Sequence, residues 1–294
     1  MKILVVCGGD SREREVSIVT GNAVYNALLK SFSNVECYIC KTSSDCVLEI
    51  LKRKPDVVFI ALHGSWGEDG RLVSALELLG IRHTASDFQS SCIAMNKYLT
   101  KLLLKENGIC TANATLIRTL DQVDTITSFP VCIKPNREGS SIGVEFASTE
   151  EELKKKVTHL LGEFNELIVE EKLVGKELTV GILNDTVFPV IEIQPLKGFY
   201  NYENKYTSGN TRYIIPADIP TSIAELTQET AKRAYDTLGC KSCARVDIIL
   251  HKNIPYVLEV NTVPGMTPTS LIPKAAKAYG MSFEELVRIM VEEA

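Results

Sequence analysis

The chain has 294 residues, 45% of them hydrophobic and 23% charged, which is the balance of an ordinary globular protein. Its net charge of −5 argues against nucleic acid as the main partner, because nucleic-acid binding normally needs a basic surface. No apolar run approaches the roughly 20 residues of a membrane span, and the start MKILVVCGGDS lacks the pattern of a signal peptide. We therefore expect a cytoplasmic protein of two or three domains that does not act at a membrane.

The first part of the chain alternates short apolar runs with helical patterns. The runs cover 2–6, 35–40 and 57–62, and their alternation with helices predicts a parallel sheet. Two glycine-containing loops, 8–11 and 63–70, follow the first and third runs. We expect both at the carboxyl edge of the sheet, where ligands bind in open α/β folds. The first loop is not GxGxxG, so it gives little support to a dinucleotide site.

Three polar residues beside these loops are candidates for binding a substrate. Glu13 and Glu15 stand near a helix start, where the helix dipole alone favours a carboxylate. The functional interpretation is that one of them receives a substrate ammonium. His63 is either a polar group on the substrate side or a hydrogen-bonded loop histidine, and the pattern leaves both open.

A helix is expected over 91–107, with Gly108 as its C-terminal stop. Lys97 falls within it, where a lone lysine more often belongs to a solvated face. After it, 129–135 reads as a strand that carries Lys134, and a Gly/Ser-rich loop, 136–144, leads to another strand.

The backbone N–H groups of such a loop form an anion-binding nest, and the hydroxyls of Ser140 and Ser141 add donors. We interpret the loop as a flap over phosphates with Lys134 as its charge partner. The alternative is an ordinary flexible hairpin.

The stretch 166–183 is expected to form two strands around Gly175. Glu170 and Glu177 stand there beside apolar positions, a mixture that suits an adenosine. The run 187–195 reads as a strand, and the long tyrosine-rich stretch 196–220 as an ordered lid. Ser222 is expected to cap the helix that follows.

The stretch 244–261 is expected to form a β-hairpin whose turn is centred on Asn253. This register places Asp247 opposite Glu259 and Arg245 opposite Asn261. Two carboxylates this close repel each other unless a cation lies between them. Two carboxylates and an amide oxygen are the ligands that Mg²⁺ takes together with substrate phosphates. Solvated polar positions on a half-exposed hairpin are the alternative.

The sequence as a whole resembles the D-alanine–D-alanine ligases of the ATP-grasp superfamily, over nearly all of its length. The resemblance rests on GGDSREREVS (8–17), HGSWGEDG (63–70), KPNREGSSIGV (134–144), YENKYTSGNTRY (202–213) and EVNTVPGMTPTSL (259–271). It implies an α/β fold of three domains, with ATP between the second and third. We assign them to residues 1–95 (Rossmann-like), 96–183 (central, with the flap) and 184–294 (C-terminal, with the lid and the hairpin).

The activity that the resemblance implies is ATP-dependent joining of two D-alanine molecules through a D-alanyl phosphate, for peptidoglycan precursors, in a homodimer. The resemblance implies residues that bind ATP, the metal ions, D-alanine and the oxyanion of the intermediate. For ATP they are Lys97, Lys134, Ser140, Ser141, Glu170, Glu177 and Lys205, and for two Mg²⁺ (or Mn²⁺) they are Asp247, Glu259 and Asn261. For D-alanine they are Glu13, His63, Ser270 and Leu271, and for the oxyanion Arg245 and the N–H of Gly265. Ser140 and Tyr206 join Glu13 in a hydrogen-bonded group.

One segment departs from the family pattern, since the chain has His83-Thr84-Ala85-Ser86 where the family often has YTGS. Tyr206 favours the dipeptide-forming type, because the D-lactate-using relatives usually lack a tyrosine there. Three alternatives remain open: a related ligase that takes D-lactate or D-serine second, a non-catalytic module that binds nucleotide and metal, and a nicotinamide-dependent enzyme.

Overall fold

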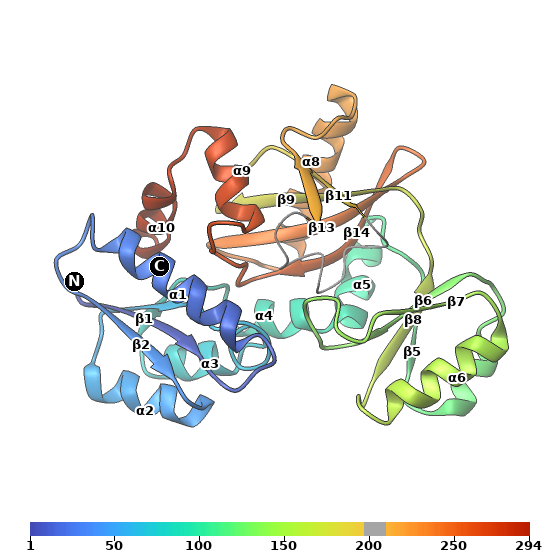
Figure 1. Ribbon diagram of the computed structural model, residues 1–294, viewed down its shortest axis with the longest axis horizontal. Coiled ribbons are helices and arrows are strands. Elements are labelled where there is room, and N and C mark those ends of the chain that lie inside the picture. Colours follow the sequence, from blue (N-terminus) through green and yellow to red (C-terminus); the bar gives the residue numbers. More distant parts are fainter. Residues whose placement is uncertain (197–209) are drawn as a thin grey trace.

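The computed structural model describes residues 1–196 and 210–294, and three sheets organise it (Figure 1). The first is a parallel sheet in the order β2-β1-β3-β4, as the alternating apolar runs predict. Its strands are β1 (Ile3–Gly8), β2 (Val35–Cys40), β3 (Val57–Ile60) and β4 (Arg82–His83), and its helices are α1 (Arg14–Leu28), α2 (Ser43–Arg53) and α3 (Arg71–Leu78). The central strand β1 is buried along its whole length, which explains its continuous apolar run.

Two helices, rather than the single one expected over 91–107, lead out of this sheet. They are α4 (Phe88–Met95) and α5 (Lys97–Glu106). The break falls at Asn96, whose backbone is extended and whose side-chain oxygen accepts from the N–H of Leu99. In the segment that departs from the family pattern, Ala85 is buried and is not among the residues of positive φ, so alanine fits there without strain.

The second sheet is antiparallel, in the order β5-β8-β6-β7, and α6 packs on it. Its elements are β5 (Ala114–Ile117), a 3-10 helix η1 (Leu120–Thr125), β6 (Val131–Pro135), β7 (Glu145–Ala147), α6 (Glu150–Leu161) and β8 (Leu167–Glu171). The Gly/Ser-rich loop joins β6 to β7, as expected. Its residues Ser140 and Ser141 both have positive φ, at 51° and 59°. Such strained backbone persists where the surroundings impose it, and it often marks a ligand-binding site.

The third sheet is built around β9, which lies between β11 and β13. Its strands are β9 (Lys176–Leu183), β10 (Thr186–Val187), β11 (Ile191–Pro195), β12 (Thr211–Ile214), β13 (Cys243–His251) and β14 (Ile254–Asn261), with helix α8 (Thr221–Thr237). The run 187–195 is thus split between β10 and β11. Helix α8 follows Pro220 as its N-cap instead of being capped by Ser222. Sheet membership changes between β8 and β9, before the boundary at 183 that we assigned from the sequence.

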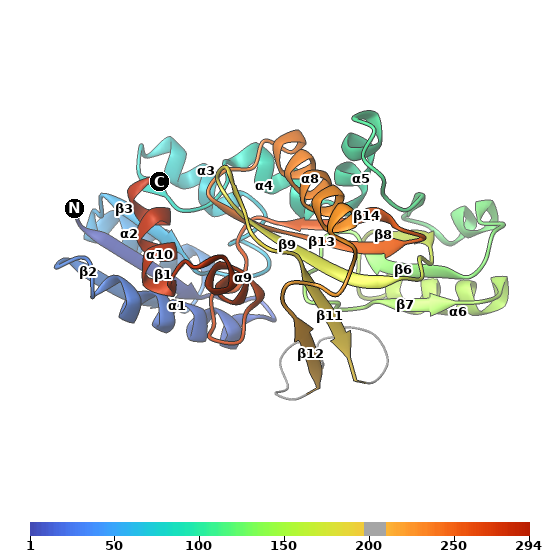
Figure 2. The same ribbon diagram turned by 90° about the horizontal axis from the view of Figure 1, so that it is seen from above.

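The last two helices are α9 (Leu271–Tyr279), which packs against β9, and α10 (Phe283–Glu292), which packs against α1 at the first sheet. Ile272 and Met290 share one buried core with Val24 and Leu28 of α1. Figure 1 shows α10 beside α1 and α9 at the end of β9, and Figure 2 shows α10 lying over the first sheet. The first and third sheets are therefore held together by a continuous apolar core. Within residues 1–196 and 210–294, no helix has the length and apolar character that crossing a membrane requires.

Candidate active site

Two cavities adjoin between the three sheets. One, of about 380 Å³, lies between the second and third sheets, and the other, of about 100 Å³, lies where α1, the flap and the loop after β14 meet. Lys97, Glu138 and Glu259 line both cavities. A ligand in the larger cavity therefore reaches the smaller one at this shared junction.

The larger cavity has an apolar part and a charged part. Phe146, Leu178 and Ile248 are among its apolar walls, while Lys134, Ser141, Glu170 and Glu177 supply charge and hydrogen bonds. This mixture of a flat apolar slot and a few polar groups is typical of a cofactor or nucleotide pocket.

Glu170 is held by two lysines within this wall. One oxygen accepts from Lys134, and the other lies 2.8 Å from the Nζ of Lys101. Burial opposes ionisation of this carboxyl, but the two ammonium groups outweigh it and lower the pKa of Glu170 to about 2. The carboxylate is therefore charged at neutral pH.

The break between α4 and α5 directs Lys97 into the junction. Its backbone N–H donates to the carbonyl of Asn136 at the end of β6. Its Nζ donates to the carbonyl of Glu138 and lies 3.4 Å from Glu259. Lys97 is 9% exposed, so it is not the solvated lysine that an isolated helix pattern suggests.

The hairpin pairs its residues as the sequence predicts near the site. Arg245 lies opposite Asn261 and Asp247 opposite Glu259, but a two-residue turn, Lys252-Asn253, closes the hairpin. Both turn residues have positive φ, as a type I′ turn requires. A β-bulge that leaves Leu258 as the extra residue then restores the register. Without it, a slip of one residue would turn the β14 side chains to the other face.

The polar residues of the hairpin form one charged cluster. Asp247 accepts two hydrogen bonds from Arg245, at 2.9 and 2.8 Å, and one from the hydroxyl of Thr179 at 2.7 Å. The side-chain oxygen of Asn261 accepts from the N–H of Val263. Among the described residues no three His, Cys, Asp or Glu side chains gather as a metal cage. A cation here would thus use two carboxylates, one amide oxygen and oxygens of a bound phosphate, and this donor set fits Mg²⁺.

At the smaller cavity, Glu13 is the buried acid of its helix start, while Glu15 is exposed. The hydroxyl of Ser140 donates to Glu13, which links the flap to the first sheet. Gly64 and Gly139 both approach this carboxylate, and a Cβ built on either would lie about 3.0 or 3.1 Å from it. The carboxylate is therefore enclosed on two sides by backbone without side chains.

His63 is a hydrogen-bonded residue that also lines the smaller cavity. Its Nε2 lies 3.0 Å from the hydroxyl of Thr20, and its Nδ1 lies 3.3 Å from Glu68. Burial raises the pKa of Glu68, and although His63 opposes the rise, the charge of Glu13 adds to it. The two interpretations of His63 are thus compatible.

The far end of the smaller cavity is formed by the loop 262–270 and the start of α9. Gly265, Ser270 and Leu271 line it. Ser270 is the N-cap residue of α9, and its Oγ accepts from the N–H of Thr267 at 3.0 Å. A helix N-terminus and a hydroxyl suit a carboxylate at this position.

A family model described as "D-ala D-ala ligase C-terminus" matches residues 98–292. A D-alanine–D-alanine ligase of Carboxydothermus hydrogenoformans is 45% identical, over 98% of this chain and 96% of that protein. The chain belongs to the D-alanine–D-alanine ligase family. The expected α/β ATP-grasp fold is confirmed as well.

Two solved structures of ligases superpose on nearly the whole chain. The D-alanine–D-alanine ligase of Bacillus anthracis complexed with ATP superposes with a TM-score of 0.87, at 33% identity, over 99% of this chain and 96% of that one. The VanG D-Ala:D-Ser ligase of Enterococcus faecalis has a TM-score of 0.84 at 28% identity, over 99% and 98%. Both types of ligase therefore share this fold.

Most of the expected site residues of this family member are brought together. Residues Lys97, Lys134, Ser141, Glu170, Glu177, Asp247 and Glu259 line the larger cavity, and Glu13, His63, Lys97, Ser140, Arg245, Glu259, Asn261, Gly265, Ser270 and Leu271 line the smaller one. Lys205 and Tyr206 lie outside the described residues.

Four further residues, Glu68, Lys101, Glu138 and Thr179, contact or line the site but do not stand out as site residues in the sequence. Glu68 and Glu138 stand within quoted motifs, so their position beside the loops was a usable signal. Lys101 and Thr179 carried no such signal.

Proposed function

We propose that this chain joins two D-alanine molecules into D-alanyl-D-alanine, forming ADP and phosphate from ATP. The observation that carries the proposal is the junction of the two cavities at Lys97, Glu138 and Glu259. A nucleotide in the larger cavity directs its phosphates to this junction, and the smaller cavity has the size and polarity for amino acids. Phosphoryl transfer depends on such positioning and charge neutralisation.

In the larger cavity, the apolar walls receive the adenine, and Glu170 and Glu177 bind at the base and ribose. Lys97 and Lys134 neutralise the α- and β-phosphates, and the flap N–H groups with Ser140 and Ser141 cover them. We assign Lys205 to the γ-phosphate from the family resemblance.

Asp247, Glu259 and Asn261 are the residues that would hold two Mg²⁺ or Mn²⁺ ions. Ions held there would supply positive charge that neutralises the phosphates of ATP. The same carboxylates lie against Arg245 and Lys97, so the cluster already places opposite charges at this point. Thr179 fixes the Asp247 carboxylate from the neighbouring strand β9.

Glu13 receives the ammonium of the first D-alanine, and the Ser140 hydroxyl orients Glu13. Tyr206 belongs to the same hydrogen-bonded group by resemblance. The carboxylate oxygen of this D-alanine forms a bond to the γ-phosphorus while the bond from phosphorus to the β,γ-bridging oxygen breaks. The products of this step are D-alanyl phosphate and ADP.

The second D-alanine lies with its carboxylate at Ser270 and Leu271. Its neutral amine attacks the acyl carbon, and Arg245 with the N–H of Gly265 stabilises the oxyanion that develops. The carbon–oxygen bond to phosphate then breaks, phosphate leaves, and the nitrogen loses a proton. Enclosure by the flap excludes water, which would otherwise hydrolyse the acyl phosphate.

The test is ADP formation from ATP with Mg²⁺, measured with and without D-alanine, with mass detection of the dipeptide. We expect ADP formation to depend on D-alanine. ADP formed with D-alanine plus D-serine or D-lactate, but not with D-alanine alone, would replace this proposal with the related ligase. Nucleotide binding without any turnover would favour the non-catalytic module.

We also propose the three domains given above, with a cytoplasmic location and a homodimeric state, as the family resemblance implies. Light scattering at two protein concentrations tests the dimer. A mass near 32.5 kDa, that of one chain, at both would refute it.

A further inference from the structure

Lys101 is a buried lysine that lies just outside the proposed nucleotide site. It stands one turn after Lys97 on α5 and is 2% exposed. Its Nζ is 2.8 Å from Glu170 and donates to the hydroxyl of Thr111 at 3.0 Å. Thr111 in turn donates to the carbonyl of Val257 on β14. Lys101 is thus fixed between the second and third sheets without lining the cavity itself.

Two lysines share one carboxylate in this cluster. Glu170 is 3% exposed and lies between Lys101 on one side and Lys134 on the other. Burial favours the neutral form of Lys101 and lowers its pKa, while Glu170 counteracts this effect. With all three groups ionised, one positive charge remains, and Lys134 is the lysine that faces the cavity.

We propose that Lys101 is a positioning residue for nucleotide binding. Because Lys101 neutralises part of the charge of Glu170, it leaves Lys134 available to an anionic phosphate. A carboxylate paired with Lys134 alone would form a neutral pair and hold Lys134 away from the phosphates. Because charges interact strongly in such a site, removing the second lysine matters even though it never contacts the nucleotide. This inference rests on the proposed function, which places phosphates beside Lys134.

A different role, support of the packing between α5 and β8, predicts another pattern of variants. Under charge sharing, Lys101→Met should weaken nucleotide binding, and adding Glu170→Gln should strengthen it again because the cluster again carries one positive charge. Under a packing role, the double variant loses more contacts and should be worse than the single one.

The test is the Kd of ADP with Mg²⁺, measured by calorimetry on the full chain without D-alanine. We expect Lys101→Met to bind about tenfold more weakly than wild type, and the double variant to bind more tightly than Lys101→Met although it also lacks the Glu170 carboxylate. Lys101→Arg should stay near wild type, since it keeps the charge. The matched control is Lys105→Met on the same helix, whose exposed Nζ contacts Asn113, and it should change the Kd by less than about twofold.

Equal Kd values for wild type and Lys101→Met would overturn the proposal, as would a double variant weaker than the single one. If Lys101→Met does not fold, the comparison passes to Glu170→Gln and the double variant, where we expect the first to bind ADP about tenfold more tightly. A double variant that fails to fold would contradict charge sharing, because charge sharing predicts that the protein tolerates the loss of both charges together. A chain that shows this ADP pattern but no D-alanine-dependent turnover would refute the proposed function alone.

Discussion

The two cavities are built in different ways from the same chain. The larger one is walled mostly by strands of two sheets, including β6, β8, β9, β13 and β14, and the flap adds Glu138, Ser141, Ile142 and Val144. The smaller one is walled mostly by loops and helix ends from several parts of the chain, including Glu13, Gly139 and Gly265. A sheet-walled cavity is formed once its domains pack, whereas a loop-walled one depends on the closure of each loop.

This difference separates binding from chemistry. A nucleotide meets walls fixed by hydrogen-bonded strands, so its affinity depends on the apolar slot and on charges there. The amino acids meet a pocket that Ser140 of the flap completes by its hydrogen bond to Glu13. Changes at the junction should abolish turnover, and changes on either side should affect one substrate.

The proposed metal ligands, Glu259 at the junction and Asp247 beside it in the larger cavity, give the largest expected effect. Asp247→Ala and Glu259→Ala each remove a proposed metal ligand, and we expect kcat to fall by at least about a thousandfold in either variant. Glu225→Gln, an exposed acid on α8, is the control and should match wild type. The measurement is D-alanine-dependent ADP formation across a range of Mg²⁺ concentrations. Turnover close to wild type in either variant would contradict the metal assignment.

The hairpin shows how far the sequence carries the site. Its alternation and turn residues predict which side chains oppose one another, because the period of a strand is fixed. The pairs came out as expected, yet through a shorter turn and a bulge at Leu258. The shorter turn and the bulge each shift the register by one residue in opposite directions, so the sequence pattern does not reveal either of them. The parallel first sheet was predicted for a similar reason, since short apolar runs alternate with helical patterns along one stretch of the chain.

Lys101 shows what the sequence does not carry. On an amphipathic helix a lysine reads as solvated, and its burial arises from Glu170 and Thr111, which are distant in sequence. The sequence also does not predict that β9 belongs to the third sheet, because β9 pairs with β13, which is distant along the chain. The residues found from the sequence stand in dense motifs, whereas Lys101 and Thr179 stand outside them and act through partners that only the fold brings near.

On the amino-acid side, Glu13→Gln should raise the KM for D-alanine by about fiftyfold or more, because a buried charge-assisted contact to the ammonium is lost. The Kd of ADP should change by less than about twofold. Glu15→Gln is a matched control in the same helix turn, where the acid is exposed, and it should leave both values unaltered. If Glu15→Gln raised the KM as much as Glu13→Gln, the two acids would have to exchange roles.

On the nucleotide side, Phe146→Ala opens the apolar wall and should weaken ADP binding about fivefold to tenfold. The ring also lies 4.6 Å from the Nζ of Lys172, so the loss includes a contact within the wall. The KM for D-alanine should stay within about twofold of wild type. A rise in that KM with unchanged ADP affinity would show that the wall serves the other cavity.

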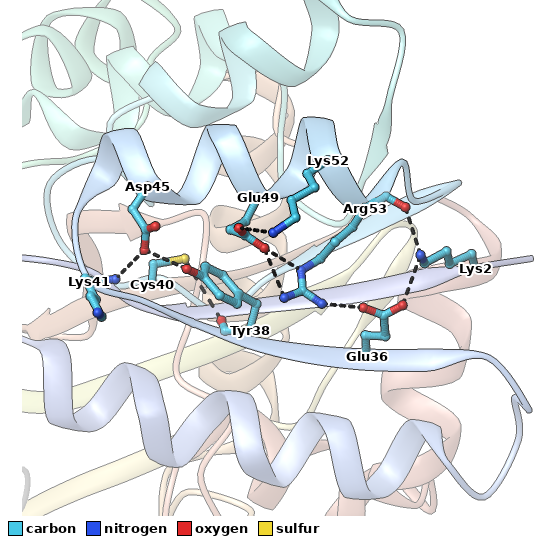
Figure 3. A network of polar contacts seen from close by, with 9 residues as sticks. All are labelled: Lys2, Glu36, Tyr38, Cys40, Lys41, Asp45, Glu49, Lys52 and Arg53. Carbon is cyan, nitrogen blue, oxygen red and sulfur yellow. Dashed lines mark hydrogen bonds and ion pairs between the residues drawn. The ribbon is translucent and has the colours of Figure 1, made fainter.

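The smallest effect is expected in a region that belongs to neither cavity, the ion-pair network between β2 and α2 (Figure 3). Arg53 contacts Glu36 at 2.6 Å and Glu49 at 3.0 Å, and all three side chains are partly exposed. Arg53→Met should therefore lower the free energy of unfolding by no more than about 1 kcal/mol, with both substrate affinities unchanged.

The pH dependence of the decrease in unfolding free energy tells more about its cause than the size of the decrease does. Hydrogen bonds from Lys2 and then Arg53 lower the pKa of Glu36, so its stabilising contribution is present above the unfolded pKa. It is lost as pH falls through the lowered folded value. Urea unfolding of wild type and Arg53→Met should thus differ at pH 7 and converge in acid. A difference that persists at low pH would mean that Arg53 stabilises by packing over Tyr38, 4.9 Å from its ring, rather than by charge.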